Sequence, residues 1–176
     1  MSEMRHDPLM RAIAIMTDWR LVQTFECEAL WREVGSGNEQ LFKLHAEPIH
    51  SSYSFVEPAT GKQWSYDDRT RVSVLDGRPF EHRPENVLTD PFAVRLAFPL
   101  SLPIWGRRHD TYRMVGAHQD GSDLIVHLTG RAVQGLEGTV TIDVERGMAV
   151  RIDASTLRLE YRGIERARSL FGAQVT

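Results

Sequence analysis

The run Gly106-Arg107-Arg108-His109-Asp110 has the composition of a charged turn and contains the densest basic point of the sequence, Arg107-Arg108-His109. A histidine beside a carboxylate can transfer protons in general acid–base catalysis when both converge with other groups on one pocket. Arg108, His109 and Asp110 are therefore the best candidates for a small enzyme. No partner stands at the spacing of a catalytic triad, however, and the composition is that of a charged turn. We predict that the protein is not an enzyme and has no catalytic residues, with this run as the alternative.

The same run offers a second chemistry, because the guanidinium groups of Arg107 and Arg108 can bind an anion. Arginine donates charge-assisted hydrogen bonds to phosphate and carboxylate groups. Arg107 and Arg108 are thus candidates for contact with an anionic headgroup. A solvated loop that binds nothing is the competing interpretation.

Histidine and cysteine usage gives no pattern for a metal site. His45 and His50 are five residues apart across Pro48, so they share neither a helical face nor a dependable strand face. A metal centre needs three or four converging ligands. Cys27, the single cysteine, lies on the apparent apolar face of a strand, which favours a buried structural thiol over a nucleophile. We predict no metal site and no cofactor.

Charge and composition exclude several classes of function. The chain has 21 basic and 24 acidic side chains, a net charge of −3, which gives no general attraction to nucleic acid. Motifs for hydrolases, nucleotide-binding loops and dinucleotide-binding folds are missing from the sequence. No run approaches the roughly 20 apolar residues that a membrane helix requires. A polar start without a signal-peptide core predicts a cytoplasmic protein, with a mature secreted or periplasmic form as the alternative.

Large aromatic side chains are more informative, because many of them fall on one face of alternating strands. Seven aromatic residues from Phe25 to Tyr66 should cluster over one side of a sheet. A cluster of this kind either fills a core or lines an apolar cavity. The candidates for lining a pocket are Trp31, Phe42, Tyr53, Phe55, Trp64, Tyr66, Phe92, Phe98 and Trp105.

The elements that would position these side chains are mostly strands. Alternation of apolar and polar residues predicts an antiparallel meander over 112–161, with one dry face and one charged face. Earlier strands are predicted at 24–34, 40–46, 52–57, 63–67 and 70–75. The segment 77–86 has the composition of a loop, and the apolar segment 100–105 is predicted to cross an apolar surface as a connector.

Helices are predicted at the two places where an aspartate precedes a proline. Asp7-Pro8 should begin a helix over about 8–18, and Asp90-Pro91 one over 90–98. A short helix is also predicted over about 163–172. The fold class is therefore α+β in a single domain over 1–176: eight to ten antiparallel strands form a curved sheet, an incomplete β-barrel, with short helices on its concave face.

The run Gly61-Lys62-Gln63-Trp64-Ser65-Tyr66-Asp67 resembles a strand of bacterial lipoprotein-carrier proteins of the LolA/LppX type. The order of the following elements, from a short helix near Asp90 to the later strands, is similar too, and the resemblance covers about Thr24 to Arg162. It implies an incomplete antiparallel barrel with helices on its concave side, which holds acyl chains. The sequence departs from these carriers at Cys27, which lies inside a strand and not at a lipid-attachment position near the start.

These observations predict a non-catalytic binding protein that holds a hydrophobic or amphipathic, lipid-like molecule on the concave face. Short helices cannot seal a sheet of about eight strands, so either aromatic side chains or a ligand must fill the gap. Arg107 and Arg108 would meet a headgroup at the mouth of the cavity. An interaction scaffold with a solid core is the alternative, and its signature would be an exposed apolar segment at 100–105. The sequence leaves the oligomeric state open.

Overall fold

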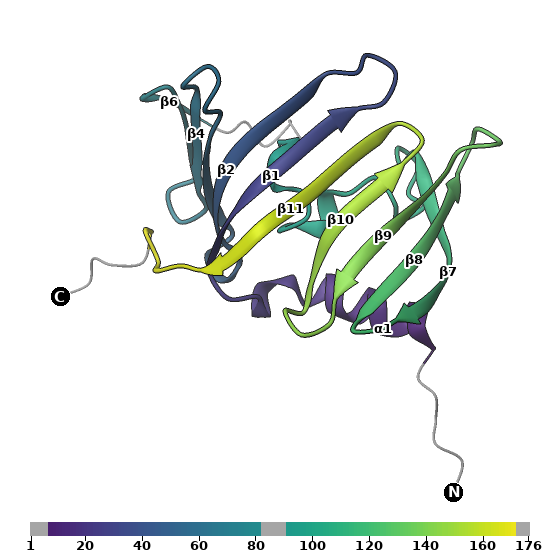
Figure 1. Ribbon diagram of the computed structural model, residues 1–176. Helices are drawn as coiled ribbons and strands as arrows, with labels where there is room; N and C mark the ends of the chain where they lie inside the picture. Colours follow the sequence, from purple (N-terminus) through teal and green to yellow (C-terminus); the bar gives the residue numbers. More distant parts are fainter. Residues whose placement is uncertain (1–6, 82–90, 172–176) are drawn as a thin grey trace, which may run out of the picture.

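A computed structural model describes residues 7–81 and 91–171, which form one large antiparallel sheet (Figure 1). Its strands are β1 (Phe25–Glu33), β2 (Glu39–Glu47), β3 (Ser52–Val56), β4 (Gln63–Asp67), β5 (Val72–Leu75), β6 (Arg78–Glu81), β7 (Tyr112–Asp120), β8 (Asp123–Gly130), β9 (Glu137–Asp143), β10 (Met148–Ala154) and β11 (Leu157–Arg166). The helical elements are α1 (Pro8–Thr17) and four 3₁₀ turns: η1 (Trp19–Leu21), η2 (Pro48–His50), η3 (Phe92–Val94) and η4 (Pro99–Ser101). The fold is therefore mostly β.

The sheet consists of two meanders joined in its middle. Its order is β6-β5-β4-β3-β2-β1-β11-β10-β9-β8-β7, so every neighbouring pair is consecutive in the chain except β1 and β11. Their long antiparallel register, from Phe25 opposite Arg166 to Glu33 opposite Leu157, unites the two halves. Within the described residues the outermost strands β6 and β7 do not pair with each other, so the sheet stays open. The predicted curved antiparallel sheet is confirmed, with eleven strands among the described residues instead of about eight to ten.

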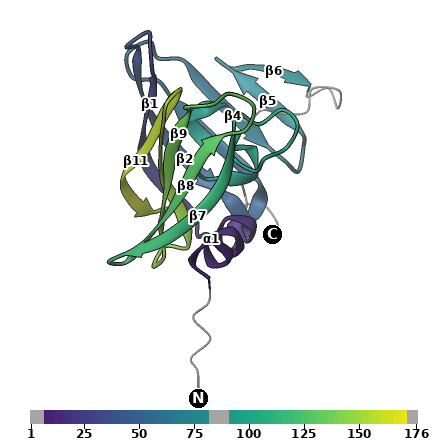
Figure 2. The same ribbon diagram turned by 90° about the vertical axis from the view of Figure 1, so that its right-hand side faces the viewer.

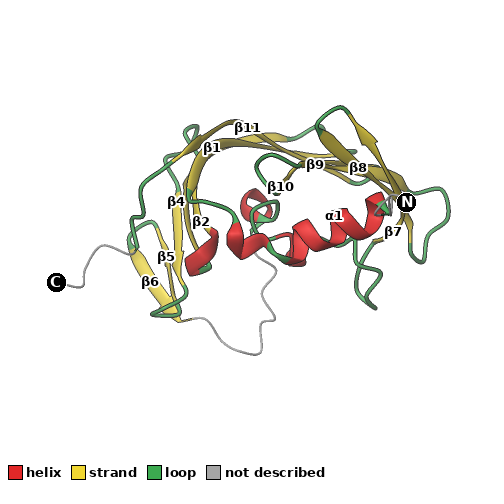
Figure 3. Ribbon diagram, turned by 90° about the horizontal axis from the view of Figure 1, so that it is seen from below, coloured by secondary structure: helices red, strands yellow, loops and turns green. Residues whose placement is uncertain are grey.

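The helix α1 lies under the concave side of the sheet, where it contacts β7, β8 and β10 (Figures 2 and 3). Its start follows from Asp7, whose Oδ1 accepts a hydrogen bond from the backbone N–H of Leu9 at 2.9 Å, and from Pro8 at the first helical position. Ala12 and Met16, one turn apart, are buried against the strands. The predicted helix over 8–18 is confirmed to within one residue.

The second predicted helix, over 90–98, is wrong within its described part. Residues 92–94 form the 3₁₀ turn η3 and the chain then turns on without an α-helix; Asp90 itself lies outside the described residues. Pro99 disfavours the α conformation of the residue before it, and Phe98 has an extended φ of −123°. These turns still fill the concave side, because Val94, Leu96 and Phe98 are buried.

Two further predicted segments also differ. The helix expected over 163–172 is not formed in its described part, because β11 continues to Arg166 through pairing with β1 and residues 167–171 are not helical. The loop expected over 77–86 contains β6, which pairs with β5; residues 82–86 lie outside the described part. Pro79 is compatible with β6 because this strand lies at an edge of the described sheet, where a missing N–H costs no ladder bond.

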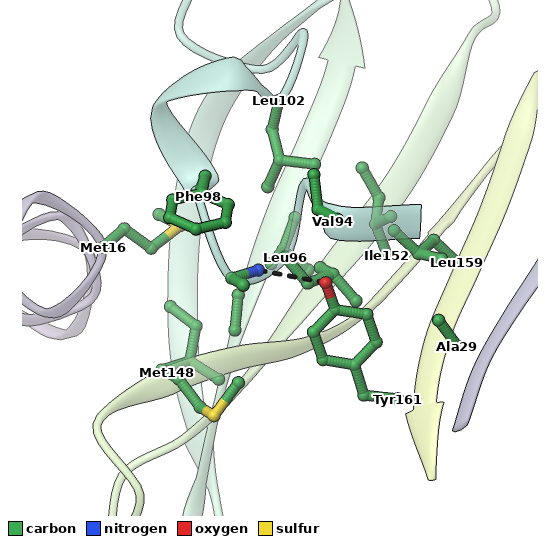
Figure 4. Packing of buried hydrophobic residues seen from close by; sticks show 14 of the residues in the cluster. Met16, Ala29, Val94, Leu96, Phe98, Leu102, Met148, Ile152, Leu159 and Tyr161 are labelled. Atoms are coloured by element: carbon green, nitrogen blue, oxygen red, sulfur yellow. Dashed lines mark hydrogen bonds between the residues drawn. The ribbon is translucent and has the colours of Figure 1, made fainter. Parts of the chain in front are cut away.

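The 3₁₀ segments are fastened to the sheet by one buried hydroxyl. Tyr161 in β11 donates a hydrogen bond from its hydroxyl to the carbonyl of Ala93 at 2.8 Å. The same hydroxyl accepts one from the N–H of Ala97 at 3.2 Å, the dashed line in Figure 4. Tyr161 is 5% exposed, and the surrounding side chains, such as Leu96 and Ile152, are apolar. Irregular backbone in such surroundings needs partners for its polar groups, and this hydroxyl supplies two.

We predict that Tyr161→Phe lowers the free energy of unfolding by about 1–3 kcal/mol, because a buried carbonyl and a buried N–H each lose a hydrogen-bond partner. Urea denaturation followed by tryptophan fluorescence measures this change. Tyr66→Phe is the matched control, since the Tyr66 hydroxyl donates to the exposed carboxylate of Asp68 and its loss should cost less. Equal effects of the two substitutions would contradict this role of Tyr161.

Candidate functional site

The concave face of β2, β3 and β4 carries a continuous aromatic surface, which we call the aromatic wall. Strand pairing explains its formation, because Phe55 lies opposite Trp64, and Tyr53 lies opposite Tyr66. The ring centroids of Phe55 and Trp64 are 6.1 Å apart, and those of Tyr53 and Tyr66 are 5.8 Å apart. The wall consists of Phe42, Tyr53, Phe55, Trp64, Tyr66 and Phe98, linked by further ring contacts of 5.4–6.3 Å.

Burial changes from one end of the wall to the other. Tyr53 and Phe98 are 4% and 7% exposed, and Trp19 packs edge-on against Phe98 at 5.1 Å, so this end belongs to the packed core. Phe42, Phe55, Trp64 and Tyr66 are half-buried. The wall therefore combines a solid inner end with an outer end whose rings retain accessible surface.

A second aromatic pair extends this surface along β1. Trp31 stacks on Phe92 with ring centroids 5.1 Å apart and an interplanar angle of 16°. The guanidinium carbon of Arg95 lies 4.1 Å from the centre of the Phe92 ring, a cation–π contact. Phe92 is 41% exposed, and the buried indole N–H of Trp31 has no hydrogen-bond acceptor among the described residues. Eight of the nine predicted aromatic candidates thus lie in the wall or in this pair.

Trp105, the ninth candidate, makes its polar contact elsewhere. Its indole N–H donates to the carbonyl of Pro99 at 2.9 Å. Its backbone forms an isolated antiparallel bridge with Arg113 of β7. Leu102 and Ile104 are buried, whereas Leu100 is 45% exposed. The segment 100–105 therefore packs largely on its own chain, as the predicted connector should.

The charged turn after Trp105 is organised by Asp110. Its carboxylate accepts hydrogen bonds from the backbone N–H groups of Trp105 and Arg107, both at 3.0 Å. The Arg107 guanidinium donates to the same carboxylate and also to the carbonyl of Leu102 at 3.0 Å. Arg107 thus has a structural ion pair in the position where a free headgroup contact was predicted.

The other members of this turn face solvent. The side chains of Arg108 and His109 are exposed, and the carbonyl of Arg108 accepts a hydrogen bond from Arg131 at 2.8 Å. Asp110, with a side chain only 7% exposed, is engaged by the turn itself. The three residues of the predicted enzyme alternative are therefore adjacent, but two point into solvent and the third stabilises backbone.

Cys27 is buried on the concave side of β1, as predicted. Burial, with a smaller contribution from the charge of Glu28, raises the pKa of the Cys27 thiol to about 12. The thiol is therefore protonated at neutral pH and is a poor nucleophile. In residues 7–81 and 91–171 no group of three or more histidine, cysteine or acidic side chains is placed to hold a metal ion. No helix of these ranges is long and apolar enough to span a membrane.

The opposite face of the same strands carries a polar groove, which we call the outer groove. Cross-strand pairing aligns Glu26, His45, Ser54, Ser65 and Val74 in one row over β1 to β5. These residues line an open groove of about 770 Å³, together with Lys43, Glu165 and Leu170. Sequence reasoning missed this site. A single signal was available, because His45 and Glu47 alternate with the apolar Leu44 and Ala46 on the other face of β2.

Comparison with known proteins identifies the fold and no family. The sequence matches no protein-family model and no curated protein. The solved structure of MucB matches with a TM-score of 0.50 and 11% identity, over 95% of this chain and 62% of MucB. MucB in complex with MucA(peri) matches with a TM-score of 0.50 and 12% identity, over 95% of this chain and 59% of that one. The MucA/MucB complex of Pseudomonas aeruginosa matches with a TM-score of 0.50 and 11% identity, over 94% and 60%.

These matches show that the chain has a MucB-like fold, which agrees with the LolA-like architecture expected from the sequence. The chain spans about three fifths of the length of the MucB structures that it matches.

We predict that Asp110→Ala destabilises the protein by about 1–3 kcal/mol, because the backbone N–H groups of Trp105 and Arg107 lose their acceptor. Thermal or urea unfolding measures the effect. His109→Ala, one residue away in the same turn and exposed, is the control and should be near neutral. A neutral Asp110→Ala would contradict the structural role that we assign to this carboxylate.

Proposed function

We propose that the protein is a non-catalytic binding protein that holds a hydrophobic or amphipathic small molecule against the outer end of the aromatic wall. The observation that supports this function is the gradient of burial along the wall. Tyr53 and Phe98 are packed solid, whereas Phe55, Trp64 and Tyr66 keep accessible ring surface on the concave side of an open sheet. Half-buried apolar rings that contact one another present a ready surface for an apolar ligand.

The energetics favour a flexible chain such as an acyl group. Each methylene transferred from water to an apolar surface contributes about 0.8 kcal/mol, so ten carbons contribute about 8 kcal/mol before ordering costs. Aromatic rings accept such a chain without specific hydrogen bonds. Arg108, exposed in the turn after Trp105, remains our candidate for contact with an anionic headgroup, whereas Arg107 would first have to leave Asp110.

The functional assay is displacement of a fluorescent fatty acid from the full chain. Wild-type protein should bind saturably, and Phe92→Glu and Trp64→Glu should each weaken binding by about 10–100-fold, because a carboxylate replaces apolar contact. Phe92 is the better-tolerated position because it is already 41% exposed. Ser65→Glu places the same charge on the opposite face of β4, next to Trp64, and should leave binding unchanged.

Circular dichroism and urea unfolding establish that each variant is folded before its affinity is compared. Absence of saturable binding by folded wild-type protein would refute the proposal. If Ser65→Glu and Phe92→Glu weaken fatty-acid binding equally, the ligand does not bind at the aromatic wall.

A second candidate function is binding of a partner polypeptide, which is favoured by the likeness to MucB structures that contain MucA. In this case the wall would bind apolar side chains of an extended segment and not a free acyl chain. A synthetic peptide of alternating leucine and serine would then protect Phe55 and Trp64 from solvent, whereas the fatty-acid probe would not bind. The matched region covers about three fifths of MucB, so this second candidate concerns contacts of that region alone.

A further inference from the structure

The last described residues of the chain lie against the outer face of the sheet. We call residues 167–171 the C-terminal strap. The N–H of Ala167 donates to the carbonyl of Thr24 at 3.0 Å, which continues the line of β11 beside the start of β1. Beyond this point the strap turns to Glu47 of β2, and Leu170 forms part of the wall of the outer groove.

Glu47 is the anchor of the strap. Its Oε2 accepts a hydrogen bond from the Ser169 hydroxyl at 2.6 Å, and its Oε1 accepts from the backbone N–H groups of Leu170 and Phe171, the latter at 3.2 Å. The Glu47 side chain is 0% exposed. A buried carboxylate is unfavourable unless donors surround it, and three of the donors here come from the strap.

These contacts decide the ionisation of Glu47. Burial alone raises its pKa, but hydrogen bonds from Ser169, His45 and the two strap amides outweigh burial, so the Glu47 pKa lies below its ordinary value. A carboxyl group with a depressed pKa stabilises the folded arrangement above its unfolded pKa, and this stabilisation is lost as the pH falls through the folded pKa. Protonation of Glu47 therefore weakens the seating of the strap.

His45 connects this carboxylate to a second one. Its Nε2 lies 3.0 Å from Glu47 Oε1, and its Nδ1 lies 3.1 Å from Glu26 Oε1. A carboxylate can only accept, so both contacts are hydrogen bonds when both ring nitrogens carry a proton. A ring nitrogen without a proton would place its lone pair against a carboxylate oxygen, which weakens the contact on that side.

Other charged groups near Glu26, His45 and Glu47 come from the neighbouring strands. Glu165 of β11 lies opposite Glu26, whose side chain is largely exposed. Ser52 of β3 lies opposite Glu47 and contacts Asp67 of β4 at 3.5 Å, and Asp67 forms an ion pair with Arg69.

We propose that the C-terminal strap is a proton-controlled closure of the outer groove. The strap is seated while the Glu47 carboxylate is ionised and accepts the hydrogen bonds of Ser169, Leu170 and Phe171. It lifts when Glu47 gains a proton. Lifting removes Leu170 from the groove and exposes the Glu47 carboxylate to solvent. This device lies on the face opposite the aromatic wall, so it is independent of the proposed lipid-like ligand.

Hydrogen exchange of single amides, measured by NMR on the full chain, tests the closure. Protection factors of Leu170 and Phe171, corrected for intrinsic exchange, should fall by roughly tenfold as the pH is lowered below the ordinary carboxyl range of about 4, because Glu47 then gains a proton. Glu47→Gln should lower protection of both amides at every pH and remove this pH dependence, because an amide side chain does not titrate.

Two further variants complete the experiment. Ser169→Ala changes only the strap, so it should lower protection of Leu170 even if Glu47→Gln disturbs the fold. Glu28→Gln neutralises another carboxylate of the outer groove with no hydrogen bond to the strap and should change nothing. Amides in the β1–β11 pairing report whether each variant is folded. Protection that is independent of pH in the wild type, or that survives in folded Glu47→Gln and Ser169→Ala, would overturn the proposal.

Discussion

The antiparallel pairing of β1 with β11 is the constraint on which the rest of the structure depends. It joins residues 25–33 to residues 157–166, so it fixes two locally formed meanders into one sheet. A shift of one residue in this register would move Ala29 and Leu159 from the concave core to the outer face, because side chains on a strand alternate. The same pairing places Tyr161 within hydrogen-bond distance of the irregular segment 92–98. It also brings the C-terminal strap to Glu47.

The burial and polarity of the two faces of the sheet differ from one end of the sheet to the other. The helix α1 covers the concave face under β7, β8 and β10, and η3 lies against β1 and β2. The apolar side chains in these places are buried. Under β3 and β4 the concave face ends in half-buried rings, of which Phe55 and Trp64 are the central pair. Behind these rings, the outer face of β2 is polar and partly closed by the strap on Glu47. The proposed ligand site on the wall and the proposed closure of the outer groove are thus separated by one layer of strands.

Period-two alternation was sufficient to predict the strands other than β6 and the shared face of Phe55 and Trp64, because both features depend on local geometry. It failed where contacts between residues far apart in the sequence determine the local structure. The segment 163–166 is a strand because β1 pairs with it. Residues 92–94 form a 3₁₀ turn where a helix was predicted, and the segment ends before Pro99. Glu47 resembled an ordinary polar residue at a strand end, since the donors that bury it lie more than 120 residues further along the chain. In the same way, the ion pair of Arg107 depends on the folded turn.

The most direct measurement for the central claim is a set of intermolecular nuclear Overhauser effects between a ¹³C-labelled ten-carbon fatty acid and the unlabelled protein. We predict contacts from the methylene protons to the rings of Phe55, Trp64 and Phe92, on the concave face. Contacts confined to residues of the outer groove such as Val74, or a saturating amount of ligand without any contact to these rings, would contradict it.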